Sequence, residues 1–321
     1  LPPLYTMQRA YYLNEAGYVL DHINQPTQAL ALFQESLSLY RKLGRREEES
    51  MLLNNVSKMY KKQGKQTLAL EHLQQRHTLC HQLGDKQGEG AALQSISEIY
   101  NTQGHNAQAL QYLKRSLPLR REAKDKEGES ITLNNIAALY SREGNYSTAV
   151  QYYKRALAVH QDLEDKQGEG LILKALSQVY SAQGEYTAAL ESLEKSLEIT
   201  RATGNMVEVG RGLHQMALLH HGQGKYTAAL KRYRASLKVN EQAGDMEGEV
   251  MILWDMGRLY QEQGELLLAE QYMSNSLLLQ EELGASGLDE YTEALEEIRL
   301  LLKGQKPRLL HKAKSLAQGW R

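Results

Sequence analysis

The feature that most constrains this chain of 321 residues is a repeat of 40 residues. Tyrosines recur at that spacing, a glycine follows each of them by four residues, and an alanine follows each glycine by five. The tyrosine slots are Tyr60, Tyr100, Tyr140, Tyr180 and Tyr260, with His220 in the remaining slot. Self-similarity at a fixed period of roughly 20–50 residues is typical of solenoids, whose neighbouring repeats bury one another's apolar faces. We count about seven copies, within residues 6–285.

Each copy predicts two helices joined by short turns. In residues 131–140, Leu133, Ile136 and Tyr140 have the three- and four-residue spacing of an amphipathic helix. Short polar residues recur before this helix, where a side-chain oxygen can cap free backbone N–H groups. These residues are Asp85, Asp125, Asp165, Asn205 and Asp245. The glycines after the tyrosine slots suit a left-handed residue at the end of the helix.

The order of residues in each copy resembles the tetratricopeptide repeat. An aliphatic residue, a small residue such as Ser57 or Ala137, the tyrosine, the glycine and the alanine follow one another at matching positions. The common repeat has about 34 residues and a leading Trp, whereas this chain has 40 residues and Leu53, Leu93 or Leu133 in that slot. It is similar to the long repeats of kinesin light chain, of spindle-orientation Leu-Gly-Asn proteins and of bacterial scaffolds and sensors. The resemblance implies an all-α, right-handed superhelical solenoid of about seven helix-turn-helix repeats.

The ends of the chain differ from the repeats. Residues 1–5 form an N-terminal flank. Residues 286–304 predict a capping helix with an acidic face, as solenoid ends require, and Asp289 is expected to cap the start of this helix. Residues 305–321 form a basic tail without acidic residues. For this tail a frayed terminus, an additional docked helix and a helix that binds a partner or a membrane surface all stay open.

Composition argues against several classes of function. The formal net charge of −1 provides no global field that would attract nucleic acid or an anionic membrane. No apolar run reaches the ~20 residues of a membrane span. The single cysteine, Cys80, cannot form an internal disulfide, so a reducing cytoplasm is the expected location.

The sequence offers little for catalysis or metal binding. His77, Cys80 and His81 have ligand-like spacing, but zinc usually requires four ligands, and an ordinary helix face explains them better. No phosphate-binding glycine motif occurs. We therefore expect that the chain is not an enzyme and that it binds no metal and no cofactor. Arg76 and His77 replace the small residue and leucine of other copies, as in Ser116 and Leu117, which indicates either looser packing there or contact with a partner.

In tetratricopeptide arrays the first helix of each repeat lines the concave face, and this resemblance implies a binding stripe in our chain. Its residues differ between copies, whereas the packing residues repeat. The predicted partner-binding residues are Asn54, Asn55, Lys58, Lys61, Lys62, Gln94, Asn134, Asn135, Arg142, Lys174, Gln178, Arg211, His214, Trp254 and Arg258.

A variable stripe on a regular scaffold favours recognition of a ligand that does not itself repeat. The pairs Asn54-Asn55 and Asn134-Asn135 match family members whose amides hold an extended peptide, since an amide both donates and accepts. The stripe has more basic than acidic residues, which favours an acidic peptide. The sequence thus predicts a protein-interaction scaffold for a protein or extended peptide. The alternative is a ligand-sensing regulatory segment of a larger signalling or defence protein.

Overall fold

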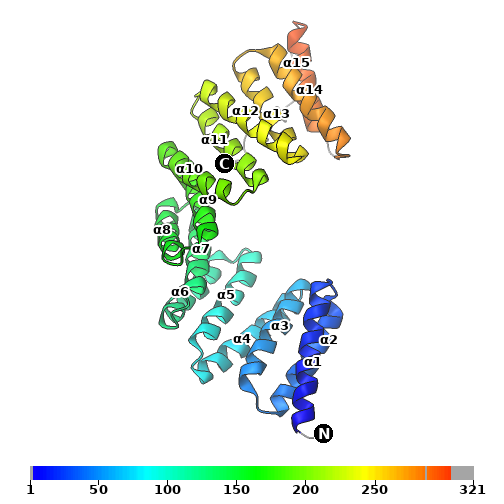
Figure 1. The fold of residues 1–321 in the computed structure, drawn as a ribbon, viewed down its shortest axis with the longest axis vertical. Helices are drawn as coiled ribbons and strands as arrows, with labels where there is room; N and C mark the ends of the chain where they lie inside the picture. Colours follow the sequence, from blue (N-terminus) through cyan, green and yellow to red (C-terminus); the bar gives the residue numbers. More distant parts are fainter. Residues whose placement is uncertain (1–2, 286–287, 305–321) are drawn as a thin grey trace. The chain divides into compact units, whose positions relative to one another are not determined.

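The computed structural model describes residues 3–285 and 288–304, which contain fifteen helices and no strand (Figure 1). The prediction of an all-α helical solenoid is confirmed. The helices are α1 (Pro3–His22), α2 (Pro26–Lys42), α3 (Arg46–Lys62), α4 (Gln66–Leu83), α5 (Lys86–Thr102), α6 (Asn106–Glu122), α7 (Lys126–Arg142), α8 (Tyr146–Asp162), α9 (Lys166–Ala182), α10 (Tyr186–Ala202), α11 (Met206–Gly222), α12 (Tyr226–Ala243), α13 (Met246–Glu262), α14 (Leu266–Glu282) and α15 (Asp289–Leu302). The basic tail lies outside the described residues.

The helices pack as hairpins, each of which has an odd-numbered first helix and an even-numbered second helix. They form two compact units. Unit 1 contains α1 to α8, and unit 2 contains α9 to α15. Within each unit the second helix of one hairpin also packs on the first helix of the next, as α2 does on α3 and α10 does on α11. This is the nearest-neighbour packing that gives a solenoid its stability.

The predicted caps define where the first helices begin. The carboxylate of Asp85 accepts a hydrogen bond of 2.8 Å from the backbone N–H of Gly88. The other four predicted caps make the same contact three residues ahead: Asp125, Asp165, Asn205 and Asp245. Helix α15 begins at Asp289, as predicted, but the predicted cap is wrong: Asp289 lies inside the first turn, and Leu288 occupies the cap position without a side-chain bond. Asp289 still complements the positive end of the helix dipole.

A recurring serine closes five of the seven hairpins tightly. Ser36 on α2 donates from its hydroxyl to the carbonyl oxygen of Ala10, 26 residues earlier on α1, at 2.7 Å. Four later serines make the same bond at 2.7–2.9 Å: Ser116, Ser196, Ser236 and Ser276. All five serines are buried. A small side chain here allows the two backbones to approach, and its hydroxyl satisfies its own hydrogen-bonding need.

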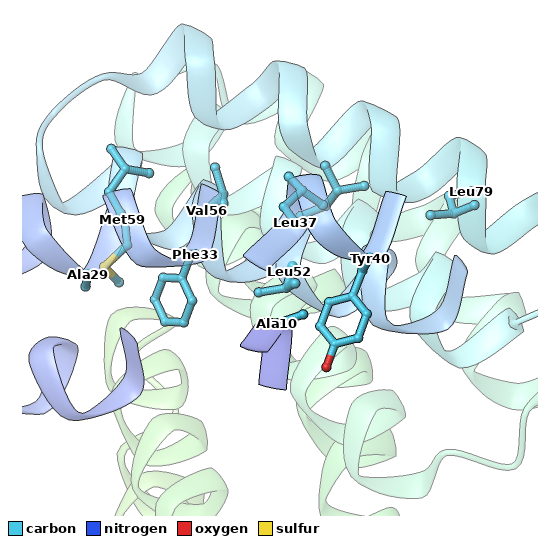
Figure 2. Packing of buried hydrophobic residues seen from close by; sticks show 11 residues of the cluster. Ala10, Ala29, Phe33, Leu37, Tyr40, Leu52, Val56, Met59 and Leu79 are labelled. Atoms are coloured by element: carbon cyan, nitrogen blue, oxygen red, sulfur yellow. The ribbon is translucent and has the colours of Figure 1, made fainter. Parts of the chain in front are cut away.

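Apolar residues fill the space between successive hairpins. In unit 1, Phe33, Leu37 and Tyr40 of α2 pack with Leu52 and Met59 of α3 (Figure 2). The tyrosine slots lie beside this core and are mostly half-buried. Three of them stack on a second tyrosine twelve residues later, with ring centroids 5.3–5.8 Å apart: Tyr100 on Tyr112, Tyr140 on Tyr152, and Tyr260 on Tyr272. The tyrosines thus tie the first helix of a hairpin to its second.

The two terminal helices present different outer faces. On α1, Tyr12 and Val19 are more than half exposed. The equivalent slots of later first helices are mostly buried against the preceding hairpin, as Leu52 and Met59 are. On α15, Leu295 and Ile298 are buried while its acidic residues face outward. The array is therefore capped by a polar face only at its C-terminal helix, within the part of the chain that the structure describes.

We expect the buried leucines between hairpins to carry much of the stability. Leu193 on α10 is 1% exposed, and Leu193→Ala should reduce the free energy of unfolding by about 2–5 kcal/mol, because it leaves a cavity. Leu171 on α9, 64% exposed in the same unit, is the matched control and should lose less than about 0.5 kcal/mol. Urea unfolding followed by circular dichroism measures both. Equal losses in the two variants would contradict the assignment of the packing face.

A second expectation concerns the turn after α6. Its left-handed position is Lys124, with a φ of 54°, where most other second helices end in a glycine such as Gly84 or Gly244. A side chain in this conformation costs about 1 kcal/mol. Lys124→Gly should therefore raise the free energy of unfolding by roughly 0.5–1 kcal/mol in urea titrations. The control Lys126→Gly, in the first turn of α7, should lower it, and the reverse order would show that Lys124 is not strained.

Candidate functional site

The predicted binding residues all lie on first helices, in two groups. Stripe 1, in unit 1, consists of Asn54, Asn55, Lys58, Lys61 and Lys62 on α3, Gln94 on α5, and Asn134, Asn135 and Arg142 on α7. Stripe 2, in unit 2, consists of Lys174 and Gln178 on α9, Arg211 and His214 on α11, and Trp254 and Arg258 on α13. Neighbouring first helices touch within a unit, as α3 and α5 do, so each stripe is a set of adjacent surfaces.

The three lysines of stripe 1 are paired with acids on adjacent first helices. Lys58 and Lys62 both bind the carboxylate of Asp21 on α1, the Lys58 Nζ at 2.8 Å from Oδ2. Lys61 Nζ lies 2.7 Å from Glu98 Oε2 on α5. Arg142 donates instead to the neutral side chain of Asn101. The lysines therefore tie neighbouring repeats together as well as contributing positive charge to the surface.

Asp21 is held in its charged form by this arrangement. Burial by itself raises the pKa of its carboxyl group, but the hydrogen bonds and charges of Lys58 and Lys62 outweigh burial and bring the pKa below its ordinary value of 3.8. A carboxylate whose folded-state pKa is lowered stabilises the fold above its ordinary pKa. That stabilisation is lost as the pH falls through the lowered value.

The pairing predicts a pH-dependent effect of Asp21→Asn. At pH 7 the substitution should reduce the free energy of unfolding by about 0.5–1 kcal/mol, since it leaves two lysines without their acid. The difference from the unaltered protein should begin to shrink as the pH falls below 3.8, the ordinary value, because Asp21 of the unfolded chain then takes up its proton. It should vanish only once the pH passes the lowered folded-state pKa, where the folded protein also carries a neutral group at this position. Urea titrations at pH 7, 4 and 3 test this. Glu71→Gln on the exposed face of α4 is the control, and an equal, pH-independent loss in both variants would contradict the prediction.

The two asparagine pairs of stripe 1 are not equivalent. Asn55 is 6% exposed and donates to the Asn14 Oδ1 at 3.3 Å and to the Tyr18 hydroxyl at 3.0 Å, both on α1. Asn134 and Asn135 are half-buried and make no side-chain hydrogen bond with the described residues. The amides of α7 are therefore free to meet a partner, while Asn55 joins α3 to α1.

Two arginines of the second helices reach stripe 1, and the predicted stripe does not include them. Arg76 on α4 donates from Nη1 to the Asn54 Oδ1 at 2.8 Å. Arg120 on α6, 8% exposed, donates from Nη2 to the Gln94 Oε1 at 3.4 Å and forms an ion pair with Asp125. For Arg76 the signal in the sequence was its position in the small-residue slot. The slot of Arg120 varies between copies, so its type gave no such signal.

Stripe 2 is closely balanced in charge. Lys174 Nζ and Arg211 Nη1 bind the two carboxylate oxygens of Glu208 at 3.0 and 2.8 Å. Burial raises the pKa of Glu208, but these two cations outweigh it and the pKa is lowered. His214 Nε2 lies 2.7 Å from the Asp255 Oδ2 on the next first helix. Gln178 and Arg258 are exposed.

Trp254 lies where the last repeat meets the capping helix. Its ring is half-buried and contacts Tyr291 of α15 edge-on, with centroids 4.5 Å apart. The aromatic pair helps attach α15 to α13. The part of Trp254 that stays exposed remains a predicted partner contact.

The histidines and the cysteine of α4 have structural surroundings. Cys80 is buried, 3.1 Å from the Ser50 Oγ, and burial raises the pKa of its thiol. His77 Nε2 and His81 Nδ1 lie 3.6 and 3.2 Å from the same oxygen of Glu89 on α5. Among the described residues no group of three or more potential ligands is arranged to hold a metal ion.

A hollow in the surface of the described residues lies away from both stripes. Arg41, Glu49, Glu71 and Gln75 are among its lining residues, on α2, α3 and α4, and its volume is about 600 Å³. It is wide and lined mainly by long polar side chains, and it brings no stripe residue to its wall. In the described ranges, no helix is long and apolar enough to cross a bilayer.

Stacked helical hairpins with regular packing faces and irregular outer stripes define a helical repeat protein. The family model of the tetratricopeptide repeat matches residues 48–122, 128–202 and 208–282, and the chain belongs to this family. No curated protein matches the sequence.

Solved structures share the fold at low sequence identity. One is a signal transduction ATPase with a tetratricopeptide repeat sensor from Pyrococcus horikoshii, with a TM-score of 0.73 and 16% identity over 89% of our chain. Our chain covers 44% of that protein. Another is a Rap protein complexed with competence and sporulation factor, with a TM-score of 0.54 and 14% identity over 86% of our chain and 76% of that chain. A protein from Podosopora anserina with nearly identical repeats of the kinesin light chain type has a TM-score of 0.52 and 17% identity over 62% of our chain and 98% of its own.

Proposed function

We propose that this chain is a protein-interaction scaffold that binds a protein or extended peptide along its first helices. The observation that carries the proposal is the contrast between two adjacent slots of the repeat. One slot is leucine in six copies, from Leu53 to Leu253, and is buried or half-buried. The next residue points along the stripe and is in turn Asn54, Gln94, Asn134, Lys174, His214 and Trp254. A regular frame with a variable surface suits a ligand that does not repeat. The proposal assigns no catalytic step and no cofactor.

The structural neighbours support a role in binding. The Rap protein of similar fold was solved in complex with a factor, and the repeats of the ATPase are described as a sensor. The second neighbour favours an alternative for our chain, a ligand-sensing regulatory segment of a larger signalling protein. The two functions share the same surface and differ in what the bound partner controls.

For stripe 1 we propose an extended acidic peptide, including one that ends in a free carboxylate. Among the described residues, Lys58 and Lys62 pair with Asp21 and Lys61 pairs with Glu98, while Arg142 pairs with no acid. The four cations of this surface thus have two carboxylates between them. Asn134 and Asn135 add amides that can both donate to a peptide carbonyl and accept from its N–H. In stripe 2 the three cations are matched by Glu208, Asp255 and Glu262, so charge there favours neither sign.

The test is a peptide array followed by fluorescence polarisation at low and physiological salt. In the double variant Lys58→Gln with Arg142→Gln, acidic peptides should bind about 5- to 30-fold more weakly, because two cations of about 0.5–1 kcal/mol each are lost. The control is Lys42→Gln with Lys65→Gln, which removes the same charge from exposed positions outside the stripe and should bind like the unaltered protein. Salt should weaken binding to the unaltered protein more than to the stripe variant.

Two results would count against the proposal in different ways. Equal binding to both double variants, or a preference for basic peptides, would overturn the acidic partner and leave the scaffold intact. Binding that is insensitive to substitutions in either stripe, including Asn134→Ala with Asn135→Ala, would overturn the use of the first helices.

A further inference from the structure

One slot on the second helices departs from the rest of the repeat. Its occupants in the seven copies are Ser36, Arg76, Ser116, Ala156, Ser196, Ser236 and Ser276. The five serines are buried and close their hairpins through a bond to the first helix. Arg76 is the one large and charged member of the set, and its guanidinium cannot occupy the space of a serine hydroxyl.

The Arg76 side chain runs instead toward stripe 1. Its Nη1 donates to the Asn54 Oδ1 at 2.8 Å, and Asn54 lies on the stripe face of α3. The Nε–H group is buried and has no acceptor among the described residues. Arg76 and its acceptor Asn54 are both half-buried.

Arg76 also lacks an acid of its own. No described carboxylate lies within ion-pair distance of it, and residues 1–2, 286–287 and 305–321 contain no Asp or Glu. Asp85 is close enough to favour its charge, but that carboxylate caps α5 by accepting from the Gly88 N–H. Arg120 also lies near, and its charge is matched by Asp125.

A buried Nε–H without an acceptor and a guanidinium without an acid reduce the stability of the chain when no partner is bound. Burial lowers the pKa of the Arg76 guanidinium, and the positive charge of Arg120 also lowers it. Cys80 and Asp85 raise the pKa but do not outweigh burial. A half-buried guanidinium with an unsatisfied N–H stabilises a fold poorly unless an anion completes it. Five of the other copies show that serine in this slot satisfies itself within the hairpin.

We propose that Arg76, together with Asn54, is a carboxylate-binding position of stripe 1. The assignment rests on the proposed binding of a peptide to this stripe and names the contact that selects an acidic one. A guanidinium presents N–H groups in a planar fork that matches the two oxygens of a carboxylate. Lys58, Lys61 and Lys62 already have acids, whereas Arg76 has none. The carboxylate belongs either to an Asp or Glu side chain of the partner or to its C-terminus.

Single-residue probes separate these two sources. N-acetylglutamate α-amide has only the side-chain carboxylate, N-acetylglutamine has only the terminal one, and N-acetylglutamine α-amide has neither. Each is titrated into the ¹⁵N-labelled chain while the Arg76 Nε–H resonance is followed, and inorganic phosphate is titrated separately. We expect a saturable shift with at least one carboxylate probe and none with the neutral amide. No saturable shift with either carboxylate, or one with phosphate alone, would overturn the assignment.

Substitutions test the same position with peptides. Paired array peptides that differ by Glu for Gln should differ about tenfold in affinity for the unaltered protein, which corresponds to one charge-assisted contact. That difference should vanish in Arg76→Ser and in Arg76→Gln. It should persist in the control Arg155→Ser, which removes an exposed arginine from α8 in the same unit. If the difference persists in Arg76→Ser, the assignment to Arg76 is overturned but the scaffold is not. If no peptide binds at all, the scaffold is overturned, and the titration with single-residue probes decides on Arg76.

The thermal stability of Arg76→Ser provides a further check. Because serine can donate to the Ser50 carbonyl as its counterparts do to their first helices, we expect the Tm to rise by roughly 2–4 °C. A Tm that is unchanged or higher also shows that loss of binding does not result from unfolding. A fall in Tm, with the Arg76 resonance indifferent to carboxylates, would identify Arg76 as a packing residue and overturn the proposal.

Discussion

The closure of six of the seven hairpins by a small residue on the second helix is the constraint on which the rest of the structure depends. When Ser36 donates to the Ala10 carbonyl, the two helices lie close enough that their larger apolar residues cannot fit between them. Those residues, such as Phe33 and Leu37, must pack against the next hairpin instead. The array is therefore a consequence of tight hairpins, and the stripe side of the first helices is left outside the apolar packing between hairpins.

Much of the fold follows from the sequence because its determinants are local or strictly periodic. The caps at Asp85 and Asp245 depend on backbone N–H groups three residues away, and the left-handed glycines depend on one backbone angle. Such features can be recognised without knowing the distant contacts. Asp289 shows where this reasoning fails, because a helix can begin one residue earlier without any side-chain cap when its apolar face already anchors it.

The candidate site was less accessible to the same reasoning. Its helices were predicted because the repeat assigns them. The partners of many of its side chains, however, lie 37 or 41 residues away, on an adjacent first helix. Lys58 and Asp21, or His214 and Asp255, are ordinary surface residues in the sequence and become pairs only when the helices are placed side by side. Asn55 likewise changes from a candidate peptide contact to a tie between α3 and α1.

Arg76 combines both kinds of information. Its departure from the repeat is visible in the sequence, whereas its hydrogen bond to Asn54 on α3 appears only in the structure. In a chain whose stability is the sum of similar interfaces, one weakened hairpin can be tolerated because its neighbours still fold against each other. The slot most important for closing a hairpin is then also the place where a long side chain can pass from the second helix to the stripe. Asn54 accepts it there, and in the next repeat Gln94 accepts Arg120 in the same sense, with Asp125 supplying the anion within the chain. Arg120 has an acid within the described chain and Arg76 has none. Position 76 is therefore where a ligand can supply the carboxylate.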